Sequence, residues 1–210
     1  MLTECIILAG GLGTRLRSVV ADQPKVLAEV NGFPFLKYII DHALSQGCKH
    51  IILSTGYMHE KVEEFIGNHY PQEEISFAIE EDPLGTGGGI LNALKKCKTD
   101  DVIVLNGDTF FNIRFSDLYE QYLSHHSVFS IALKQMQKFS RYGTVTCNQD
   151  GRILSFNEKQ FMATGLINAG IYIVNRKLFM SMNWPEKFSM EKDFMEKYTD
   201  SLSMHGFTFD

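Results

Sequence analysis

A glycine turn flanked by cations has the residue types that phosphate chemistry needs. Gly10 and Gly11 follow an apolar run that ends at Ala9, and Arg15 and Lys25 come soon after in an otherwise acidic chain. Glycines let the backbone approach a ligand closely, and their N–H groups can surround an anion. The glycines alone fit a purely structural turn equally well, but the two cations favour a loop that binds nucleotide phosphates.

Two common phosphate-binding motifs do not fit this turn. A dinucleotide-binding fingerprint would need a further glycine where Leu16 stands, and a P-loop would need a Gly-Lys-Ser/Thr sequence that the chain lacks. Ligands of α/β sheets bind at the carboxyl ends of the strands, which is where this turn lies. The sequence therefore predicts a nucleotide-phosphate loop of a different type.

The carboxylate of Asp108 is a candidate metal ligand. It follows the apolar run Val102–Leu105 in the sequence Asn106-Gly107-Asp108. A carboxylate at the end of a buried strand, beside phosphates, suits Mg²⁺, a hard cation that prefers oxygen ligands. An aspartate that only caps a turn or a helix is the structural alternative.

Strand and helix signals alternate along the first half of the chain and would position both features. Short apolar runs indicate buried strands, and longer stretches with an apolar stripe indicate helices. This order predicts a mostly parallel sheet with helices on both faces. The predicted strands are Cys5–Ala9, His50–Thr55, Ile75–Ile79 and Val102–Leu105, and the predicted helices are residues 35–46, 59–69 and about 86–96.

The pattern changes from about residue 128. Strand-like segments follow one another with few helical stretches between them, which predicts partly antiparallel strands added to the sheet. No linker, repeat or low-complexity segment interrupts the sequence, so we expect one α/β domain over residues 1–210. The predicted later strands are residues 128–133, 143–146, 152–156 and 167–174.

The composition argues against several classes of protein. The chain has 210 residues, 44% of them hydrophobic and 12% aromatic, which is too apolar for a disordered protein. Its net charge of -5 argues against a nucleic-acid binder. No apolar run is long enough to cross a membrane, and the four irregularly spaced cysteines match no zinc or disulfide pattern. We expect reduced thiols and a cytoplasmic protein.

The glycine turn and the segment around Lys25 resemble the signature of the sugar-1-phosphate nucleotidyltransferase family. The two matching segments are Gly10–Leu16 and Pro24–Leu27. Ser18, where the family commonly has proline, and Ala28–Val30 depart from the signature without changing a charged position. The resemblance continues in order along essentially the whole chain through Asn31–Leu36, Gly85–Gly87, Asn106–Asp108, Glu158–Lys159 and Asn168–Gly170.

This resemblance implies a fold and a reaction. The fold would be a Rossmann-like, three-layer αβα domain with a mostly parallel central sheet and a small antiparallel sugar-binding extension. About residues 1–125 would bind the nucleotide, and about residues 126–210 would bind the sugar phosphate. In the family reaction, a sugar 1-phosphate oxygen attacks the α-phosphorus of a nucleoside triphosphate, and pyrophosphate leaves. Because the nucleophile is already an anion, the enzyme's task is to position two anions and to spread their charge.

The resemblance also implies roles for individual residues. Arg15, Lys25 and Asp108 would be catalytic, the two cations on phosphate oxygens and Asp108 on Mg²⁺. A second metal-binding aspartate is expected on a later strand, either Asp210 or a residue beyond it. The nucleotide would be bound by Leu8, Gly10, Gly11, Gly13, Thr14, Glu80, Gly85, Thr86 and Asn106, and the sugar phosphate by Tyr142, Gly143, Glu158, Lys159 and Asn168.

Glu80 bears on the identity of the base. Relatives that use uracil or thymine commonly have glutamine at this position. A carboxylate only accepts hydrogen bonds, and guanine presents two adjacent donors, N1–H and the 2-amino group. Uracil and thymine pair a donor with an acceptor oxygen, so the wrong base would cost about 1–3 kcal/mol. Glu80 therefore predicts GTP, unless it is only a member of the solvated acidic run Glu80–Asp82.

Within the family, the resemblance implies guanylyl transfer to a heptose 1-phosphate, as in bacterial surface-glycan synthesis. A mannose 1-phosphate acceptor, or uridylyl or thymidylyl transfer to another sugar phosphate, is the alternative within the enzyme class. A non-catalytic nucleotide-sugar sensor and a cytidylyltransferase of the phosphocholine type are further alternatives. We expect Mg²⁺ as cofactor, GTP and a sugar 1-phosphate as partners, and neither nucleic acid nor membrane; a homo-oligomer stays open.

Overall fold

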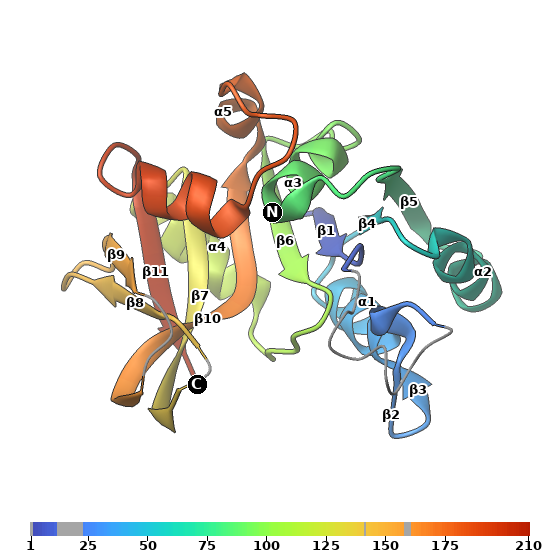
Figure 1. Ribbon diagram of the computed structural model, residues 1–210, viewed down its shortest axis with the longest axis horizontal. Coiled ribbons are helices and arrows are strands. Elements are labelled where there is room, and N and C mark those ends of the chain that lie inside the picture. The colour runs from blue at the N-terminus through green and yellow to red at the C-terminus, as the bar shows by residue number, and fades with distance from the viewer. Residues whose placement is uncertain (1, 12–22, 141, 158–160) are drawn as a thin grey trace.

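One continuous sheet runs through the computed structural model, which describes all residues except 1, 12–22, 141 and 158–160 (Figure 1). The sheet has nine strands in the order β11-β7-β10-β6-β1-β4-β5, with β8 paired to β10 and β9 paired to β8. Its strands are β1 (Glu4–Leu8), β4 (His50–Thr55), β5 (Glu74–Ile79), β6 (Asp101–Asn106), β7 (Phe129–Phe139), β8 (Thr144–Cys147), β9 (Ile153–Asn157), β10 (Met162–Asn175) and β11 (Met204–Phe209). A separate hairpin joins β2 (Glu29–Val30) to β3 (Phe33–Pro34).

The strand directions confirm the predicted mixed sheet. Strands β6, β1, β4 and β5 form a parallel ladder, as the alternating pattern of the first half predicts. Strand β10 is antiparallel to both β6 and β7, and β8 and β9 add a short antiparallel pair beside it. The helical elements are η1 (Lys25–Leu27), α1 (Phe35–Ser45), α2 (His59–His69), α3 (Gly85–Leu94), α4 (Phe115–Ser124), α5 (Arg176–Ser181) and the π-helix η2 (Met190–Glu196).

Two hydrophobic cores, one on each face of the sheet, produce the three predicted layers. Successive side chains of a strand point to opposite faces, so Ile7 packs in the core beneath α1, α2 and α4, and Ile6 packs beneath α3, α5 and η2. Both isoleucines are fully buried. Apolar residues on both faces explain why the central strands appear in the sequence as unbroken apolar runs.

The sequence-based prediction gives no bounds for several elements. These are η1, the β2–β3 hairpin, α4, α5, η2 and β11. Helix α4 does carry a helical stripe, since Phe115, Leu118 and Tyr122 are all buried on one side. By contrast, η2 and β11 depend on distant partners: η2 packs against α3, and β11 pairs in parallel with β7. Tertiary packing rather than local periodicity therefore determines these two elements.

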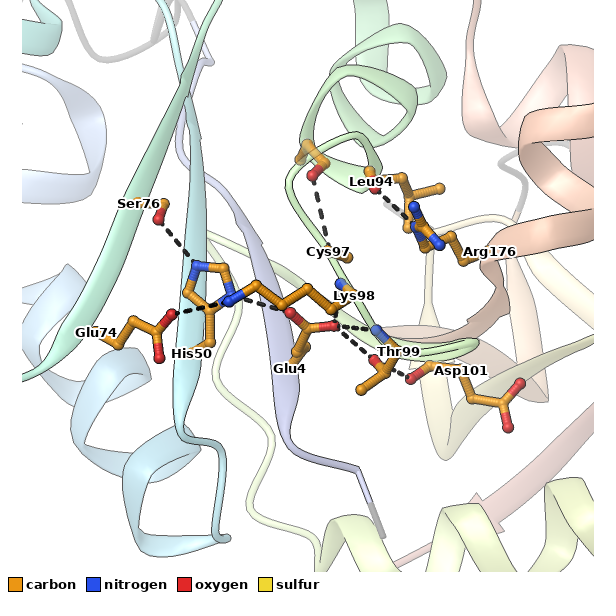
Figure 2. Close-up of polar contacts among 11 residues, drawn as sticks. Glu4, His50, Glu74, Ser76, Leu94, Cys97, Lys98, Thr99, Asp101 and Arg176 are labelled. Carbon is orange, nitrogen blue, oxygen red and sulfur yellow. Dashed lines mark hydrogen bonds and ion pairs between the residues drawn. The ribbon is translucent and has the colours of Figure 1, made fainter.

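A buried carboxylate ties together the amino ends of three strands and the loop before β6 (Figure 2). Glu4 Oε1 lies 2.9 Å from His50 Nδ1, and His50 Nε2 lies 2.9 Å from Ser76 Oγ. Glu4 Oε2 accepts hydrogen bonds from the backbone N–H groups of Lys98 and Thr99 and from the Thr99 hydroxyl. Burial raises the pKa of the Glu4 carboxyl, but these hydrogen bonds outweigh burial and hold the pKa below its ordinary value.

All four cysteines are free thiols, and three of them are buried, in agreement with the expectation from their spacing. In the part of the chain that the structure describes, helices lack the combined length and apolarity needed to traverse a bilayer.

Candidate active site

A cavity of about 530 Å³ opens at the carboxyl ends of β1, β4, β5 and β6. Parallel strands end at the same edge of a sheet, so residues from distant parts of the sequence meet there. Predicted residues that line the cavity are Leu8, Gly10, Gly11, Glu80, Gly85, Thr86, Asn106 and Asp108. It is also lined by residues that the sequence analysis did not select, namely Ser54, Pro83, Gly107 and Glu191.

Lys25 and Asp108 form an ion pair at one end of this cavity. Lys25 begins η1, and the two residues after it, Val26 and Leu27, are buried and anchor the segment. Lys25 Nζ lies 2.5 Å from Asp108 Oδ2. Their side chains are 33% and 47% exposed, so a ligand can reach both of them. The pair brings a cation for phosphate oxygens next to a carboxylate suited to a hard metal ion.

Glu80 is held in a defined orientation in the cavity wall. The residue follows β5, and its backbone N–H donates to the carbonyl oxygen of Thr55, 2.8 Å away. Its Oε1 accepts a hydrogen bond from Ser54 Oγ at 3.0 Å, and its Oε2 accepts one from the Leu84 N–H at 2.9 Å. The side chain is half-buried rather than part of a freely solvated acidic run. Both carboxylate oxygens therefore have fixed positions before a ligand binds.

The glycine-rich start of α3 packs against the second half of the chain. The N–H groups of Gly87 and Gly88 donate to the carbonyl oxygen of Phe188, at 3.1 and 3.4 Å. A Cβ atom on Gly87 would overlap the Phe188 ring, and Gly85 has a φ of +77° that favours glycine. Phe188 thus occupies two N–H groups of the first helical turn. Gly85 and Thr86 remain part of the cavity wall, as predicted.

Glu191 brings a carboxylate from η2 into the cavity. Its Oε2 accepts hydrogen bonds from the hydroxyls of Thr86 and Ser189, both at 2.8 Å. The Met190 N–H donates in turn to Thr86 Oγ1 at 2.9 Å. Thr86 and Glu191 are 105 positions apart in the sequence, and no local pattern connects them. Sequence reasoning therefore missed Glu191, which depends on the docking of η2 against α3.

Asn168 lies on β10 within a buried hydrogen-bond network. Its Nδ2 donates to the Tyr172 hydroxyl at 2.8 Å, and its Oδ1 accepts from the Gly170 N–H at 2.8 Å. Burial raises the pKa of Tyr172, and the negative charge of Glu191 raises it further. Gly170 packs against Asn106, which lines the cavity. The structure thus places Asn168 beside the cavity wall rather than in it, and its predicted contact with the sugar stays a prediction.

Tyr142 and Gly143 lie before β8, away from the cavity lining. The Tyr142 ring is exposed and stands 6.3 Å from that of Phe139. A Cβ atom on Gly143 would come within 2.6 Å of the Asn157 carbonyl oxygen on β9, so close strand packing already requires glycine there. Their sugar-binding role remains a prediction. The predicted residues Gly13, Thr14, Arg15, Glu158 and Lys159 lie outside the described residues.

Asp108 offers a hard metal ion one carboxylate. Its Oδ1 accepts from the Thr109 hydroxyl at 3.2 Å, while Oδ2 pairs with Lys25. Over the described residues, His, Cys, Asp and Glu side chains form no group of three suited to a metal. Mg²⁺ fits such a site, because it commonly combines one or two carboxylates with phosphate oxygens and water. Asp210 follows β11, three strands from β6, or roughly 14 Å at the usual strand spacing.

Comparisons with known proteins agree with this geometry. The sequence model of a family described as Nucleotidyl transferase matches residues 4–209. A D-glycero-alpha-D-manno-heptose 1-phosphate guanylyltransferase from Aneurinibacillus thermoaerophilus is 44% identical over 99% of this chain and 90% of that protein. Another, from Campylobacter jejuni, is 43% identical over 93% of this chain and 86% of that protein. The crystal structure of HddC from Yersinia pseudotuberculosis complexed with GMP-PN has a TM-score of 0.89 and 35% identity, covering 99% of this chain and 91% of that one.

Proposed function

Because the chain belongs to the nucleotidyl transferase family, we propose that it transfers a nucleotidyl group to a sugar 1-phosphate and releases pyrophosphate. The group transferred would be the guanylyl group of GTP. D-glycero-α-D-manno-heptose 1-phosphate is the proposed acceptor, which would make the product a GDP-heptose. Two relatives with this activity in their names, 44% and 43% identical to this chain, support the choice of acceptor.

The oriented carboxylate of Glu80 is the observation that supports guanine. It lines the cavity, and Ser54 and Leu84 hold its two oxygens in place. An ionised carboxylate has about four acceptor positions, so two remain after these hydrogen bonds. Guanine presents two adjacent donors, whereas uracil and thymine would direct an acceptor oxygen at the carboxylate. A solved relative complexed with GMP-PN is consistent with this assignment.

The ion pair at the end of β6 supports phosphoryl chemistry in the same cavity. Lys25 can hold phosphate oxygens while the acceptor phosphate approaches the α-phosphorus, which reduces the repulsion between the two anions. The resemblance assigns the triphosphate and the leaving pyrophosphate to Arg15. These cations stabilise charge as it spreads over the phosphate oxygens, and no strong general base is needed because the attacking oxygen is already ionised.

Asp108 is the residue that would hold Mg²⁺. When bound, Mg²⁺ would neutralise charge on the phosphate oxygens and orient them. Asp108 lines the cavity, and its Oδ2 pairs with Lys25. The role of Asp210 as a second ligand stays a prediction, and the three strand spacings between β11 and β6 argue against it.

The acceptor sugar would meet the second half of the chain. Among the described residues of that half, Glu191 lines the cavity with a carboxylate. Thr86 and Ser189 donate to its Oε2, so neither of these hydrogen bonds uses its Oε1. By resemblance, Lys159 would bind the sugar phosphate and Glu158 the sugar hydroxyls. Tyr142, Gly143 and Asn168 complete the proposed sugar-binding set.

A pyrophosphate-release assay tests the proposal. It combines each of the four ribonucleoside triphosphates with a panel of heptose, mannose, glucose and amino-sugar 1-phosphates. We expect release that requires Mg²⁺ and is greatest with GTP and the heptose 1-phosphate. Greatest release with mannose 1-phosphate would replace the acceptor and keep the guanylyl transfer. Tight GTP binding without release on any acceptor would contradict enzymatic activity and support the sensor alternative.

A further inference from the structure

Ser54 and Gly89 surround the Glu80 carboxylate on the side away from Leu84. Ser54 lies on β4 and is 1% exposed, and its hydroxyl donates to Glu80 Oε1 at 3.0 Å. Gly89 lies within α3 and is buried. A Cβ atom on Gly89 would come within 2.6 Å of Glu80 Oε1 and within 2.9 Å of Ser54 Oγ. The absence of a side chain at Gly89 therefore makes room for both groups at once.

Glycine inside a helix weakens the helix relative to alanine, so a glycine at position 89 needs a structural explanation. At Gly85, Gly87 and Gly88 the explanation is the close approach of neighbouring atoms, among them those of Phe188 and Leu84, which leaves no space for a side chain. At Gly89 the nearest atoms are instead the Glu80 carboxylate and the Ser54 hydroxyl. The glycine thus serves the geometry of the cavity wall rather than the packing of η2.

The contacts of Glu80 limit how its carboxylate can turn. Ser54 fixes Oε1 and the Leu84 N–H fixes Oε2, so rotation of the carboxylate plane would break one hydrogen bond or both. Gly10 also limits the space around Glu80 Oε1, since a Cβ atom on Gly10 would lie 3.4 Å from this oxygen. The free acceptor positions of the two oxygens then keep fixed directions relative to the cavity.

We propose that Ser54 and Gly89 are positioning residues that set base specificity by orienting Glu80 toward N1–H and the 2-amino group of guanine. This inference rests on the proposed function, because it takes guanine as the base bound in the cavity. Ser54 acts through Glu80 and does not itself read the base. Gly89 acts by leaving the space in which the oriented carboxylate fits.

Inosine triphosphate is the diagnostic probe, because hypoxanthine keeps N1–H and lacks the 2-amino group. The experiment measures kcat/KM for GTP and ITP in the unmodified chain, Ser54→Ala and Gly89→Ala, with the acceptor that gives the greatest pyrophosphate release. We expect the unmodified chain to prefer GTP by about tenfold or more, since a site built to bind a donor rejects the analogue that lacks it. Both substitutions should lower the GTP-to-ITP ratio toward one, with a larger loss of kcat/KM for GTP than for ITP, because GTP loses two contacts with Glu80 and ITP loses only the one to N1–H.

Two substitutions serve as matched controls. Ser130→Ala removes a buried hydroxyl from β7, one without a hydrogen-bond partner among the described residues. Gly67→Ala adds a methyl group within α2, where no described atom outside the helix's own backbone lies within 4 Å of the new Cβ. Both should keep the ratio of the unmodified chain. A purely structural role of Ser54 or Gly89 would lower turnover with GTP and ITP in parallel.

The outcomes separate this inference from the proposed function. If the unmodified chain prefers GTP and Glu80→Ala removes that preference, but Ser54→Ala and Gly89→Ala both keep the original ratio, the positioning inference is wrong and the proposed function stands. If the unmodified chain prefers UTP or another triphosphate to GTP, the proposed function fails and this inference fails with it. Should Gly89→Ala not fold, Ser54→Ala, which only removes one oxygen atom, decides alone.

Discussion

Lys25 and Asp108 bring opposite charges together at the carboxyl end of β6. Their ion pair spans 83 positions of sequence, yet both residues were predicted, because each belongs to a short motif with its own chemistry. Glu80 was predicted for the same reason. Glu191 and Ser54 could not be, because a glutamate in a polar segment and a serine in an apolar strand are ordinary until the fold places them beside the cavity.

Lys25→Met should abolish most of the activity and keep the fold. Methionine retains the length of the side chain and removes the charge that would hold phosphate oxygens, so kcat should fall by about 10²–10³-fold. Lys37→Met is the matched control, because Lys37 forms an exposed ion pair with Asp41 on α1, outside the cavity lining. Pyrophosphate release at saturating GTP measures both variants. Equal loss in the two variants, or none in Lys25→Met, would remove Lys25 from the reaction centre.

At the scale of elements, the amino edge of the sheet is held by Glu4 and the carboxyl edge carries the site. The parallel strands β1, β4, β5 and β6 therefore have one end near the Glu4 cluster and the other at the candidate site, as α/β sheets commonly do. The sequence predicted the strands from their apolar runs, but it did not predict the Glu4 cluster, whose members come from β1, β4, β5 and the loop before β6 (Figure 2). Polar partners from separate strands leave no periodic signal.

Glu4→Gln should destabilise the fold by about 3 kcal/mol, because the amide replaces a buried acceptor that serves several donors. The effect should depend on pH. The folded state lowers the pKa of Glu4. The contribution of the ionised Glu4 carboxylate to the free energy of unfolding is therefore complete above the ordinary pKa of 4.5, and it disappears as pH falls through the folded-state pKa. Urea unfolding at pH 7 and at decreasing pH measures this, and the difference between the two proteins should shrink in acid.

Glu74→Gln is the control for that measurement. Glu74 lies near the same edge of the sheet, but its side chain is 60% exposed and its ion pair with Lys98 spans 3.6 Å. Its loss should change stability by less than about 0.5 kcal/mol. A Glu4→Gln variant as stable as Glu74→Gln at pH 7 would show that the buried cluster does not stabilise the sheet.

The glycine run of α3 gives a second prediction at this scale. Gly87→Ala should destabilise the fold by about 1–3 kcal/mol despite the better helix propensity of alanine, because the new methyl group would displace Phe188. Gly67→Ala, in open space on α2, should instead be neutral or stabilise by up to about 1 kcal/mol. Thermal unfolding of both variants measures the contrast. A stabilised Gly87→Ala would show that Phe188 does not pack against α3 in this way.

At the scale of the whole molecule, the two halves of the chain share one sheet and both cores. Strand β10 lies between β6 and β7 (Figure 1). The π-helix η2 packs against α3. The parallel half could be predicted from the sequence because each strand and helix has its own periodicity. The way the second half closes the sheet could not, because β11 and η2 depend on contacts with partners far away in sequence.

Shared cores predict cooperative unfolding. The single tryptophan, Trp184, reports on the second half, where its ring stacks on Phe188 at 4.5 Å, while far-ultraviolet circular dichroism reports on all helices and strands. Both signals should show the same midpoint in urea. An earlier tryptophan transition would mean that the second half unfolds on its own.

The central claim is that guanine binds in this cavity beside Glu80. A change of nucleotide preference from GTP toward UTP in Glu80→Gln tests this claim most directly. The measurement is kcat/KM for GTP and for UTP, with the same acceptor, in the unmodified chain and in Glu80→Gln. The unmodified chain should prefer GTP, and the amide should lower the GTP-to-UTP ratio by about 10–100-fold, because it can donate to an acceptor oxygen and no longer pairs with two adjacent donors. An unchanged ratio in Glu80→Gln would contradict the assignment of this cavity to guanine.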